Sequence, residues 1–411
     1  MAGLAAASMD PSERSDDASM EELWNLTLTA GAEPVGTLLQ TRAEPDPRSF
    51  LGGGKVAELK ELIENEECDL AVFDNDLTPS QARVLEEELG VRILDRTGLI
   101  LDIFAQRARS REGKLQVELA QYRYLLPRLT GMWTHLKRQA GTSAPIGTRG
   151  PGETQLETDR RHIRRRIQKL CEELEQVRRI RGTQRKQREK NAVPVVALVG
   201  YTNAGKSTLL NTLTGDSIQT GDRLFDTLDT TTRKLDLGEQ GQMLLSDTVG
   251  FIRKLPTELV DAFRATLEEL TYADLLLHVI DISNPEWETQ ARVVDSLIFH
   301  LGAGETPCIR VYNQCDAYFG RLPSGKDEVC VSARTGEGTV TLLYAIGAKL
   351  GAGLVRIRLN LPYAEAELFS RLRRDANILS TDYRDEYIDV LAVVRPELRE
   401  KLAPYEVARD E

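Results

Sequence analysis

The sequence predicts an α/β protein whose central domain is a doubly wound, mostly parallel sheet, and two observations support this prediction. Short apolar runs alternate with helical stretches across residues 192–353, among them VPVVALVG, DLLLHVIDIS and PCIRVYNQ. Such runs followed by helices are typical of parallel strands joined by crossover helices. Residues 200–208 read GYTNAGKST directly after one of these runs and before a helical run, so a glycine-rich loop joins a strand to a helix.

Further domains are expected on both sides, because 411 residues exceed what one ordinary core holds. Residues 1–22 are mostly Ala, Ser, Asp and Glu, a composition typical of a disordered leader. Residues 23–110 alternate between apolar runs and helical patterns, which predicts a small N-terminal α/β domain. Residues 354–411 open with the alternating run VRIRLNL, followed by a helix and another strand, and predict a small C-terminal α+β domain.

Residues 111–191 predict a long helical hairpin. Two polar helical segments, roughly 111–139 and 153–191, flank GTSAPIGTRGPG, whose Gly and Pro content excludes a continuous helix. Between Arg160 and Lys190 there are 13 Lys or Arg and 4 Glu, a difference of 13 − 4 = +9. A solvated helix face would explain such a run, but an excess this one-sided more often marks contact with phosphates. We therefore expect the hairpin to face a phosphate-rich partner such as RNA.

Composition narrows the class of protein. The net charge of −11 argues against a protein that coats nucleic acid with its whole surface, so any basic stripe is expected to be local. The five cysteines are scattered without a CxxC pair, and the four histidines lie far from them, which predicts neither a disulfide framework nor a structural metal. No run approaches the roughly 18 apolar residues of a membrane span, and no targeting peptide is evident. We expect a cytoplasmic protein.

The glycine-rich loop predicts a phosphate-binding site. Gly200 and Gly205 let successive amide hydrogens turn toward phosphates, and the positive N-terminal end of the following helix adds to the attraction. Lys206 would reach the β and γ phosphates, and the Ser207 hydroxyl would ligate Mg²⁺. The residues expected to contact the nucleotide here are Gly200, Tyr201, Thr202, Asn203, Ala204, Gly205, Lys206, Ser207 and Thr208.

A second motif, DTVG, ends the apolar strand that begins at QMLLS. Asp247 suits the acidic residue that holds Mg²⁺ through water, and the Gly250 amide would sense the γ phosphate. Asp247, Thr248, Val249 and Gly250 are all expected to contact the nucleotide, and Asp247 and Gly250 are expected to move when phosphate leaves.

The residue after DTVG is Phe251, at the position where many switch GTPases place a glutamine that orients the attacking water. The Phe251 side chain can neither donate nor accept a hydrogen bond. We therefore expect slow intrinsic hydrolysis, and the sequence assigns no catalytic residue. A packing role for Phe251 is compatible with this expectation.

A third motif is expected to bind the base of the nucleotide. NQCD follows the strand CIRVY and resembles the NKxD signature, in which Asp316 would accept two hydrogen bonds from the guanine edge. Adenine offers no matching donors, and leaving a carboxylate unpaired costs roughly 1 to 3 kcal/mol, so GTP is favoured. Gln314 stands where Lys is usual and is expected to weaken affinity without removing the guanine preference. The residues expected at the base are Asn313, Gln314, Cys315, Asp316, Ser332, Ala333 and Arg334, the last three resembling an SAK loop.

Two further segments, GGGK at 52–55 and GPGETQLETDRR at 150–161, together resemble the HflX family of ribosome-associated GTPases. The resemblance extends over nearly the whole chain from about residue 33. It implies a P-loop GTPase domain followed by a small domain, and it places a second switch element in FDTLD, where Thr227 would ligate Mg²⁺ and sense the γ phosphate. The residues alone do not separate Thr227 from Thr230, Thr231 and Thr232. The nucleotide contacts implied for this loop are Phe225, Asp226, Thr227, Leu228 and Asp229.

The resemblance also implies a function. HflX-like GTPases bind the large ribosomal subunit in their GTP state, with the hairpin near the peptidyl-transferase region, and are associated with splitting stalled ribosomes under stress. The chain is thus expected to be a monomeric, Mg²⁺-dependent GTP hydrolase. The alternatives are a GTP-gated RNA-binding module in which hydrolysis is incidental, and an NTP-dependent RNA remodeller. Glu153 and Gln155 either contact rRNA at the hairpin tip or begin its second helix.

Overall fold

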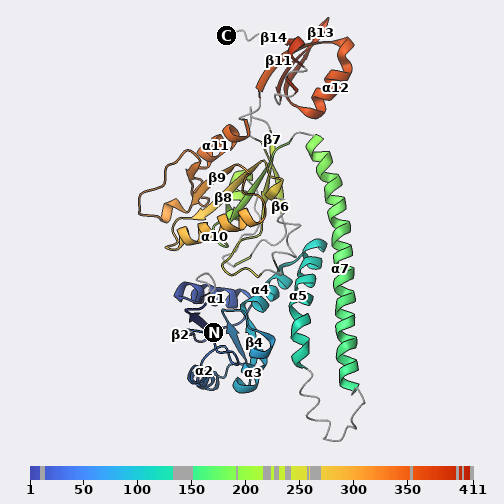
Figure 1. Cartoon of the computed structure of the whole chain (residues 1–411). Coiled ribbons are helices and arrows are strands. Elements are labelled where there is room, and N and C mark those ends of the chain that lie inside the picture. Colours follow the sequence, from blue (N-terminus) through green and yellow to red (C-terminus); the bar gives the residue numbers. More distant parts are fainter. Residues whose placement is uncertain are drawn as a thin grey trace. The chain divides into compact units, whose positions relative to one another are not determined.

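The computed structural model describes residues 1–9, 14–132, 151–190, 193–215, 224–225, 231–236, 242–256, 259, 270–351, 355–394, 398–399 and 402–407. It falls into two compact units, drawn with their element labels in Figure 1. The first contains Met1–Val177, Asp222–Leu228 and Arg253–Arg264, and the second contains Arg178–Gly221, Asp229–Ile252 and Ala265–Glu411. Two short segments that follow the nucleotide motifs in sequence therefore belong to the N-terminal unit.

The N-terminal unit begins with a four-stranded parallel sheet in the order β2-β1-β3-β4. Its core consists of strand residues and of apolar side chains from α2 and α3. Its strands are β1 (Ala2–Ala6), β2 (Leu38–Arg42), β3 (Leu70–Phe73) and β4 (Arg92–Asp95), and its helices are α1 (Asp17–Thr29), α2 (Gly53–Asn65), α3 (Pro79–Leu89) and α4 (Arg96–Arg107). The α/β fold predicted for this region is confirmed.

Local sequence explains where these helices begin and end. The Thr78 side chain accepts a hydrogen bond from the Gln81 backbone amide, and the Gln81 side chain accepts one from the Thr78 amide. This capping box, with Pro79 in the first turn, starts α3. Gly90 ends the helix in the left-handed conformation with φ 75°, which favours glycine.

The expectation of a disordered leader over residues 1–22 is wrong for residues 1–9 and 14–22. Ala2 to Ala6 form β1, an inner strand of the sheet, and Ala2, Leu4 and Ala6 are fully buried. The acidic residues are equally structural, because Asp16 caps α1 by accepting a hydrogen bond from the Ser19 amide at 2.6 Å. Composition failed here because a strand covered on both sides can be built from small alanines that carry little hydrophobic signal.

The predicted helical hairpin is present as α5 (Arg111–Met132) and α7 (Pro151–Lys190), which lie side by side in Figure 1. Leu115 and Leu119 of α5 pack against Leu170 and Leu174 of α7, so the two helices run antiparallel. The Arg166 guanidinium also donates two hydrogen bonds to Glu118, at 2.8 and 2.9 Å. The Gly-Pro segment expected at the tip lies largely outside the described residues. The backbone of Glu153 and Gln155 lies in α7, which fits their reading as helix-start residues.

The second unit holds a six-stranded sheet in the order β10-β9-β8-β5-β7-β6, parallel except for the edge strand β6. The inner strands are mostly apolar, as in VVALVG of β5, because helices cover both faces. The strands are β5 (Val195–Gly200), β6 (Thr231–Asp236), β7 (Gln242–Asp247), β8 (Leu275–Asp281), β9 (Cys308–Asn313) and β10 (Glu328–Cys330); the helices are α8 (Lys206–Thr214), α10 (Trp287–His300), η2 (Cys315–Ala317) and α11 (Thr339–Gly351). The predicted doubly wound sheet is confirmed.

The C-terminal residues form an antiparallel sheet in the order β12-β13-β11-β14. Ile357, Leu359 and Leu361 alternate along β11 and enter the core, as the sequence pattern predicts. The strands are β11 (Val355–Pro362), β12 (Asn377–Tyr383), β13 (Tyr387–Val394) and β14 (Glu406–Val407), joined by η3 (Tyr363–Glu365), α12 (Ala366–Asp375) and η4 (Ala403–Tyr405). None of the described helices combines the length and apolarity that crossing a bilayer requires.

The inner position of β1 makes a testable prediction. Leu4→Ala should lower the free energy of unfolding of the N-terminal sheet by about 2 to 5 kcal/mol, because it leaves a cavity in a closed core. Leu28→Ala provides the control, since Leu28 is 50% exposed on α1, and should change that free energy by less than about 0.5 kcal/mol. Native-state hydrogen exchange at the amides of β1 and β3 measures both. Equal effects of the two substitutions would contradict an inner strand at residues 2–6.

Candidate nucleotide-binding site

The glycine-rich loop joins β5 to α8 at the carboxyl edge of the parallel strands, where α/β sheets bind ligands. Gly200 admits no side chain, because a Cβ there would lie 2.3 Å from the Val279 carbonyl oxygen. Gly205 has φ 85° and occupies the N-cap of α8, so the cap residue itself offers no acceptor to the first amides of the helix. The loop is therefore shaped to present helix N-terminal amides to an anion.

Asn313, the last residue of β9, ties this loop to the rest of the site. Its side-chain amide donates to the Ala204 carbonyl at 2.9 Å, and its side-chain oxygen accepts from the Ala333 amide at 2.9 Å. Asn313 is buried, and a Cβ on Gly205 would approach its amide nitrogen to 2.2 Å. One buried side chain thus holds the phosphate loop, the NQCD segment and the segment at 332–334 together.

Lys206, the first residue of α8, carries the cation of the loop. Its ammonium group is buried and donates to the carbonyls of Gly200 at 3.1 Å and Tyr201 at 2.8 Å. Burial lowers the pKa of Lys206 to about 8, although the nearby Asp247 carboxylate favours the charged form. Because Asp247 only partly offsets the cost of burying this charge, Lys206 is well suited to bind the phosphates of an incoming nucleotide.

Ser207 and Asp247 lie together at the end of the loop. The Ser207 hydroxyl donates to the Asp247 carboxylate at 2.6 Å, and Asp247 is buried at the end of β7. These are the hard oxygen donors that Mg²⁺ prefers. Within the described ranges, three or more His, Cys, Asp or Glu side chains nowhere gather as a metal cage. Magnesium would therefore need phosphate oxygens and water to complete its shell, as is usual for this ion.

The DTVG motif runs from β7 along the phosphate loop. A Cβ on Gly250 would lie 2.9 Å from the Thr202 methyl group and 3.2 Å from the Lys206 nitrogen, so only glycine fits this position. The Phe251 amide donates to the Gly200 carbonyl at 3.1 Å, and its carbonyl accepts from the Thr202 amide at 2.8 Å. The Phe251 side chain is fully buried, as the packing interpretation requires.

The residues expected at the base converge beyond Asn313. The Asp316 carboxylate accepts a hydrogen bond from the Arg334 guanidinium, and Ser332 is fully buried beside it. Hydrogen bonding from Ser332 and then from Arg334 lowers the pKa of Asp316, so the carboxylate is ionised at neutral pH. The structure therefore brings residues 313–316 and 332–334 together, as the sequence predicts.

Two residues that hold Gln314 were missed by the sequence analysis. The Ser283 hydroxyl donates to the Asp281 carboxylate at 2.6 Å and lies 3.3 Å from the Gln314 side-chain oxygen. Gln314 itself has a left-handed backbone with φ 60°. The signal was the run VIDIS, because Asp281 ends β8 and β8 pairs with β9, which ends at Asn313. Neighbouring parallel strands end at the same edge, so the two segments had to meet.

The loop proposed to hold Thr227 is only partly visible. Residues 226–230 lie outside the described residues, so the choice between Thr227 and Thr230 is not addressed, whereas Thr231 and Thr232 begin β6. Phe225 is described: it is buried, and its ring lies 4.6 Å from that of Phe104 on α4. Phe225 therefore belongs to the same compact unit as Phe104.

The chain is similar to known proteins along most of its length. Three family models match in succession: GTP-binding GTPase N-terminal over residues 17–105, GTP-binding GTPase Middle Region over 107–188, and 50S ribosome-binding GTPase over 195–314. Among solved structures, a GTP-binding protein from the hyperthermophilic archaeon Sulfolobus solfataricus in complex with GDP is 24% identical with a TM-score of 0.44, covering 85% of this chain and 98% of that one.

Curated relatives are more similar in sequence. GTPase HflX of Caldanaerobacter subterraneus subsp. tengcongensis is 48% identical over 388 residues, which cover 94% of this chain and 90% of the relative. GTPase HflX of Escherichia coli K12 is 45% identical over 363 residues, covering 87% and 84%. Both matches extend far beyond the nucleotide domain. The chain therefore belongs to the HflX family of GTPases and is a GTP hydrolase.

Proposed function

We propose that this GTPase, acting in the cytoplasm as a monomer, binds the large ribosomal subunit in its GTP state and hydrolyses GTP there, dissociating or recycling stalled ribosomes under stress. The observation that carries the proposal is the one-sided charge of α7 in a chain whose net charge is −11. One of the matching family models is described as a 50S ribosome-binding GTPase, which supports the same partner.

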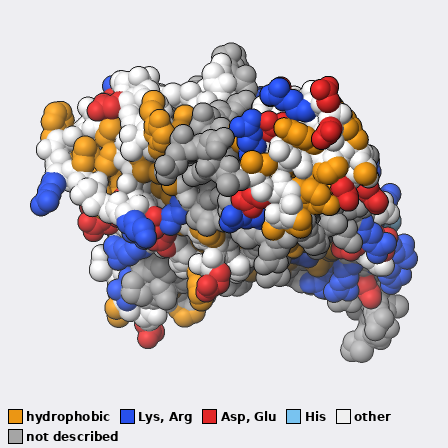
Figure 2. All heavy atoms as spheres, turned by 90° about the horizontal axis from the view of Figure 1, so that it is seen from above, with side chains coloured by type: hydrophobic (Ala, Val, Ile, Leu, Met, Phe, Trp, Pro, Cys, Tyr) orange, Lys and Arg blue, Asp and Glu red, His pale blue; other side chains and the backbone are white. Residues whose placement is uncertain are grey.

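The exposed face of α7 suits a phosphate-rich surface. Arg161, Arg165 and Lys169 are exposed, whereas Leu170 and Leu174 pack against α5. At helical spacing these cations lie on the side of α7 opposite the hydrophobic seam. Figure 2 shows Lys and Arg side chains gathered in dense groups on the visible face instead of spread evenly over it. Concentrated cations bind rRNA phosphates by releasing counterions.

The nucleotide site supplies the switch. Lys206 and the N-terminal amides of α8 would hold the β and γ phosphates, and Asp316 would accept hydrogen bonds from guanine. Ser207 would ligate Mg²⁺, with Asp247 holding it through water; when bound, this ion neutralises charge on the β and γ oxygens. Thr227 stays the proposed second magnesium ligand. The described oxygens of Ser207 and Asp247 fit this donor set.

Hydrolysis is expected to need help from the partner. Phe251 is buried and its side chain cannot orient a water molecule, so the chain lacks the usual water-positioning group at this point. Positioning and charge stabilisation provide most of the catalysis in phosphoryl transfer. We therefore propose that the large subunit accelerates turnover by ordering the two switch loops.

Nucleotide affinity should depend on pH through Lys206. Below pH 8 the lysine is already protonated when nucleotide arrives, whereas above pH 8 it must take up a proton, because phosphates favour the ammonium form. The affinity for GDP should therefore fall as pH rises above 8. Proton uptake per bound GDP should be small at pH 7 and clearly larger at pH 9. Calorimetry in buffers of different ionisation enthalpy measures this uptake, and a constant value between the two pH values would contradict the prediction.

Guanine selection should depend on Asp316. Asp316→Asn should weaken GTP binding by roughly 5-fold to 150-fold, equivalent to about 1 to 3 kcal/mol, because an amide replaces one acceptor with a donor. Xanthosine triphosphate, which presents a carbonyl in place of the amino group, should gain affinity for the variant. Asp385→Asn is the matched control, since Asp385 is exposed in the C-terminal domain. Unchanged discrimination between GTP and XTP would remove Asp316 from the base site.

Sedimentation with purified large subunits tests the proposed partner. Binding should be strong with a non-hydrolysable GTP analogue and weak with GDP, and the subunits should accelerate GTP turnover. Replacing Arg161, Arg165 and Lys169 by Gln should weaken binding and reduce the slope of log affinity against log salt by up to about 3. The control replaces the exposed Lys60, Arg321 and Lys326 by Gln. Nucleotide-independent binding, or equal turnover with and without subunits, would disprove the proposal.

A further inference from the structure

The strand order of the N-terminal sheet reverses at one point, as in other open α/β sheets. Such sheets bind ligands outside the carboxyl ends of strands where the strand order reverses. In the order β2-β1-β3-β4 that point lies between β1 and β3. Asp74 directly follows β3 there, and Ser15 lies beside it and donates a hydrogen bond to its carboxylate at 2.7 Å.

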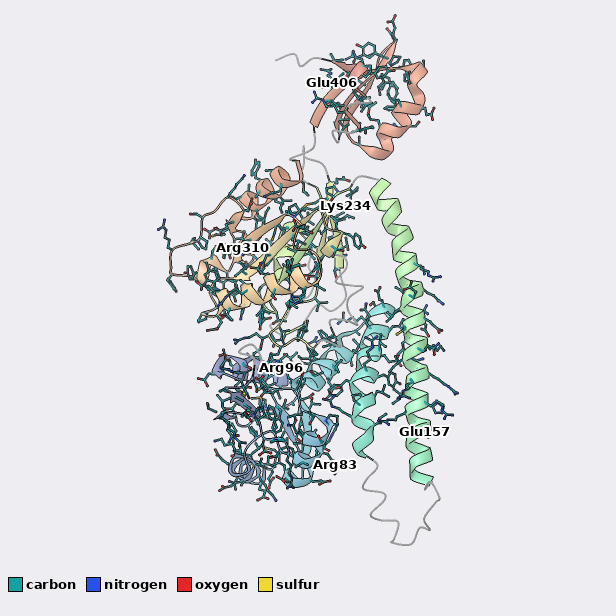
Figure 3. All side chains as sticks on the ribbon, viewed as in Figure 1. Arg83, Arg96, Glu157, Lys234, Arg310 and Glu406 are labelled. Atoms are coloured by element: carbon teal, nitrogen blue, oxygen red, sulfur yellow. The ribbon has the colours of Figure 1, made fainter. Side chains whose placement is uncertain are left out.

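The side chain of a lysine from the same chain lies at this point. The Lys254 ammonium donates to the Asp74 carboxylate at 2.5 Å and to the Ser19 hydroxyl at 3.2 Å. The Arg96 guanidinium, at the start of α4, donates to the other oxygen of Asp74 at 2.6 Å and to Glu22 of α1 at 2.5 Å. Figure 3 labels Arg96 among the side chains of this unit. We call Asp74, Arg96, Lys254, Glu22 and Ser19 the Asp74 cluster.

The Asp74 cluster is buried, so the ion pair between Lys254 and Asp74 differs from an exposed surface pair. The side chains of Asp74, Arg96 and Lys254 are 0%, 2% and 10% exposed. Burial by itself would raise the pKa of Asp74, but the charges of Arg96 and Lys254 lower it below its ordinary value. Two cations therefore face an ionised carboxylate out of reach of bulk water. Removing one partner from such a group disrupts it far more than breaking an exposed ion pair does.

Lys254 also fixes the backbone that leads away from the γ-phosphate sensor. It follows Gly250 by four residues and Phe251 by three, and the Phe251 backbone is bonded to the phosphate loop on both sides. Lys254 has φ 52°, a left-handed conformation that a non-glycine residue keeps only when its surroundings hold it. The Arg253 carbonyl accepts a further hydrogen bond from Arg96 at 3.2 Å. The short segment from Phe251 to Lys254 is thus held at both of its ends.

We propose that Asp74 is a positioning residue for GTP hydrolysis, which binds Lys254 and thereby fixes the segment that follows Gly250. The carboxyl end of β3 then has an internal ligand, the lysine of the switch segment. Phe251 places no polar side chain at the usual position, and the Asp74 cluster orders the segment that follows it. The proposal rests on the GTPase activity of the family and does not depend on the ribosomal partner.

The test uses Lys254→Met, because replacing Asp74 would also remove a hydrogen-bond acceptor of the buried Arg96. With ribosomes absent, this variant should lower kcat for GTP hydrolysis by about fivefold or more and leave KM within about twofold, since positioning acts on the transition state. Lys254→Arg keeps the charge and should restore kcat to within about twofold of the original protein. Lys60→Met is the control for lysine loss at an exposed site on α2. An unchanged kcat in Lys254→Met would overturn the proposal.

Hydrogen exchange provides a readout that a purely structural role would not move. If the Asp74 cluster holds the switch segment, the exchange of residues 14–29, which carry Ser19 and Glu22, should differ between GDP and a non-hydrolysable GTP analogue. That difference should disappear in Lys254→Met and persist in Lys60→Met. Absence of the difference in the original protein, or its persistence in Lys254→Met, would overturn the proposal. Lys254→Gln, which keeps a donor for Asp74, is the second variant should the methionine variant fail to fold.

Discussion

The nucleotide site depends on one buried hydrogen-bonded side chain, that of Asn313. Its two polar atoms join the phosphate loop to the segment around Ala333, so the parts that would hold phosphate and base are set against each other by a single amide. Leaving either polar atom of Asn313 unpaired is costly, so its two hydrogen bonds should form or break together. Gly205 has to be glycine for the same reason, because any side chain would displace Asn313.

The Asp74 cluster is likewise held together by buried groups that need partners, but here the groups are charged. A buried carboxylate requires nearby cations, and one of them, Lys254, comes from the segment four residues after Gly250. These groups meet at the reversal of strand order in the N-terminal sheet. Phe225 adds an apolar contact with Phe104. The segments Asp222–Leu228 and Arg253–Arg264 thus both belong to the N-terminal unit.

Several elements could be predicted from local sequence because their causes are local. GYTNAGKST sits between an apolar strand and a helix, and the alternation in VRIRLNL matches one buried face of β11. NQCD and the segment at 332–334 were brought together correctly because both follow parallel strands. The prediction of a disordered leader failed because composition reports only average hydrophobicity. Ala2 and Leu4 are buried because β1 lies between two other strands.

The sequence by itself therefore determined which residue types are present: a lysine and a serine after a glycine-rich turn, the aspartates Asp247 and Asp316 in two motifs, and a basic helix. Only the tertiary structure decided which distant groups share one environment. It buried Lys206 and lowered its pKa, and it placed Ser283 beside Gln314. It also paired Lys254 with Asp74 across 180 residues of sequence. No local pattern encodes such pairs, because burial and strand order, not sequence spacing, bring them within hydrogen-bonding distance.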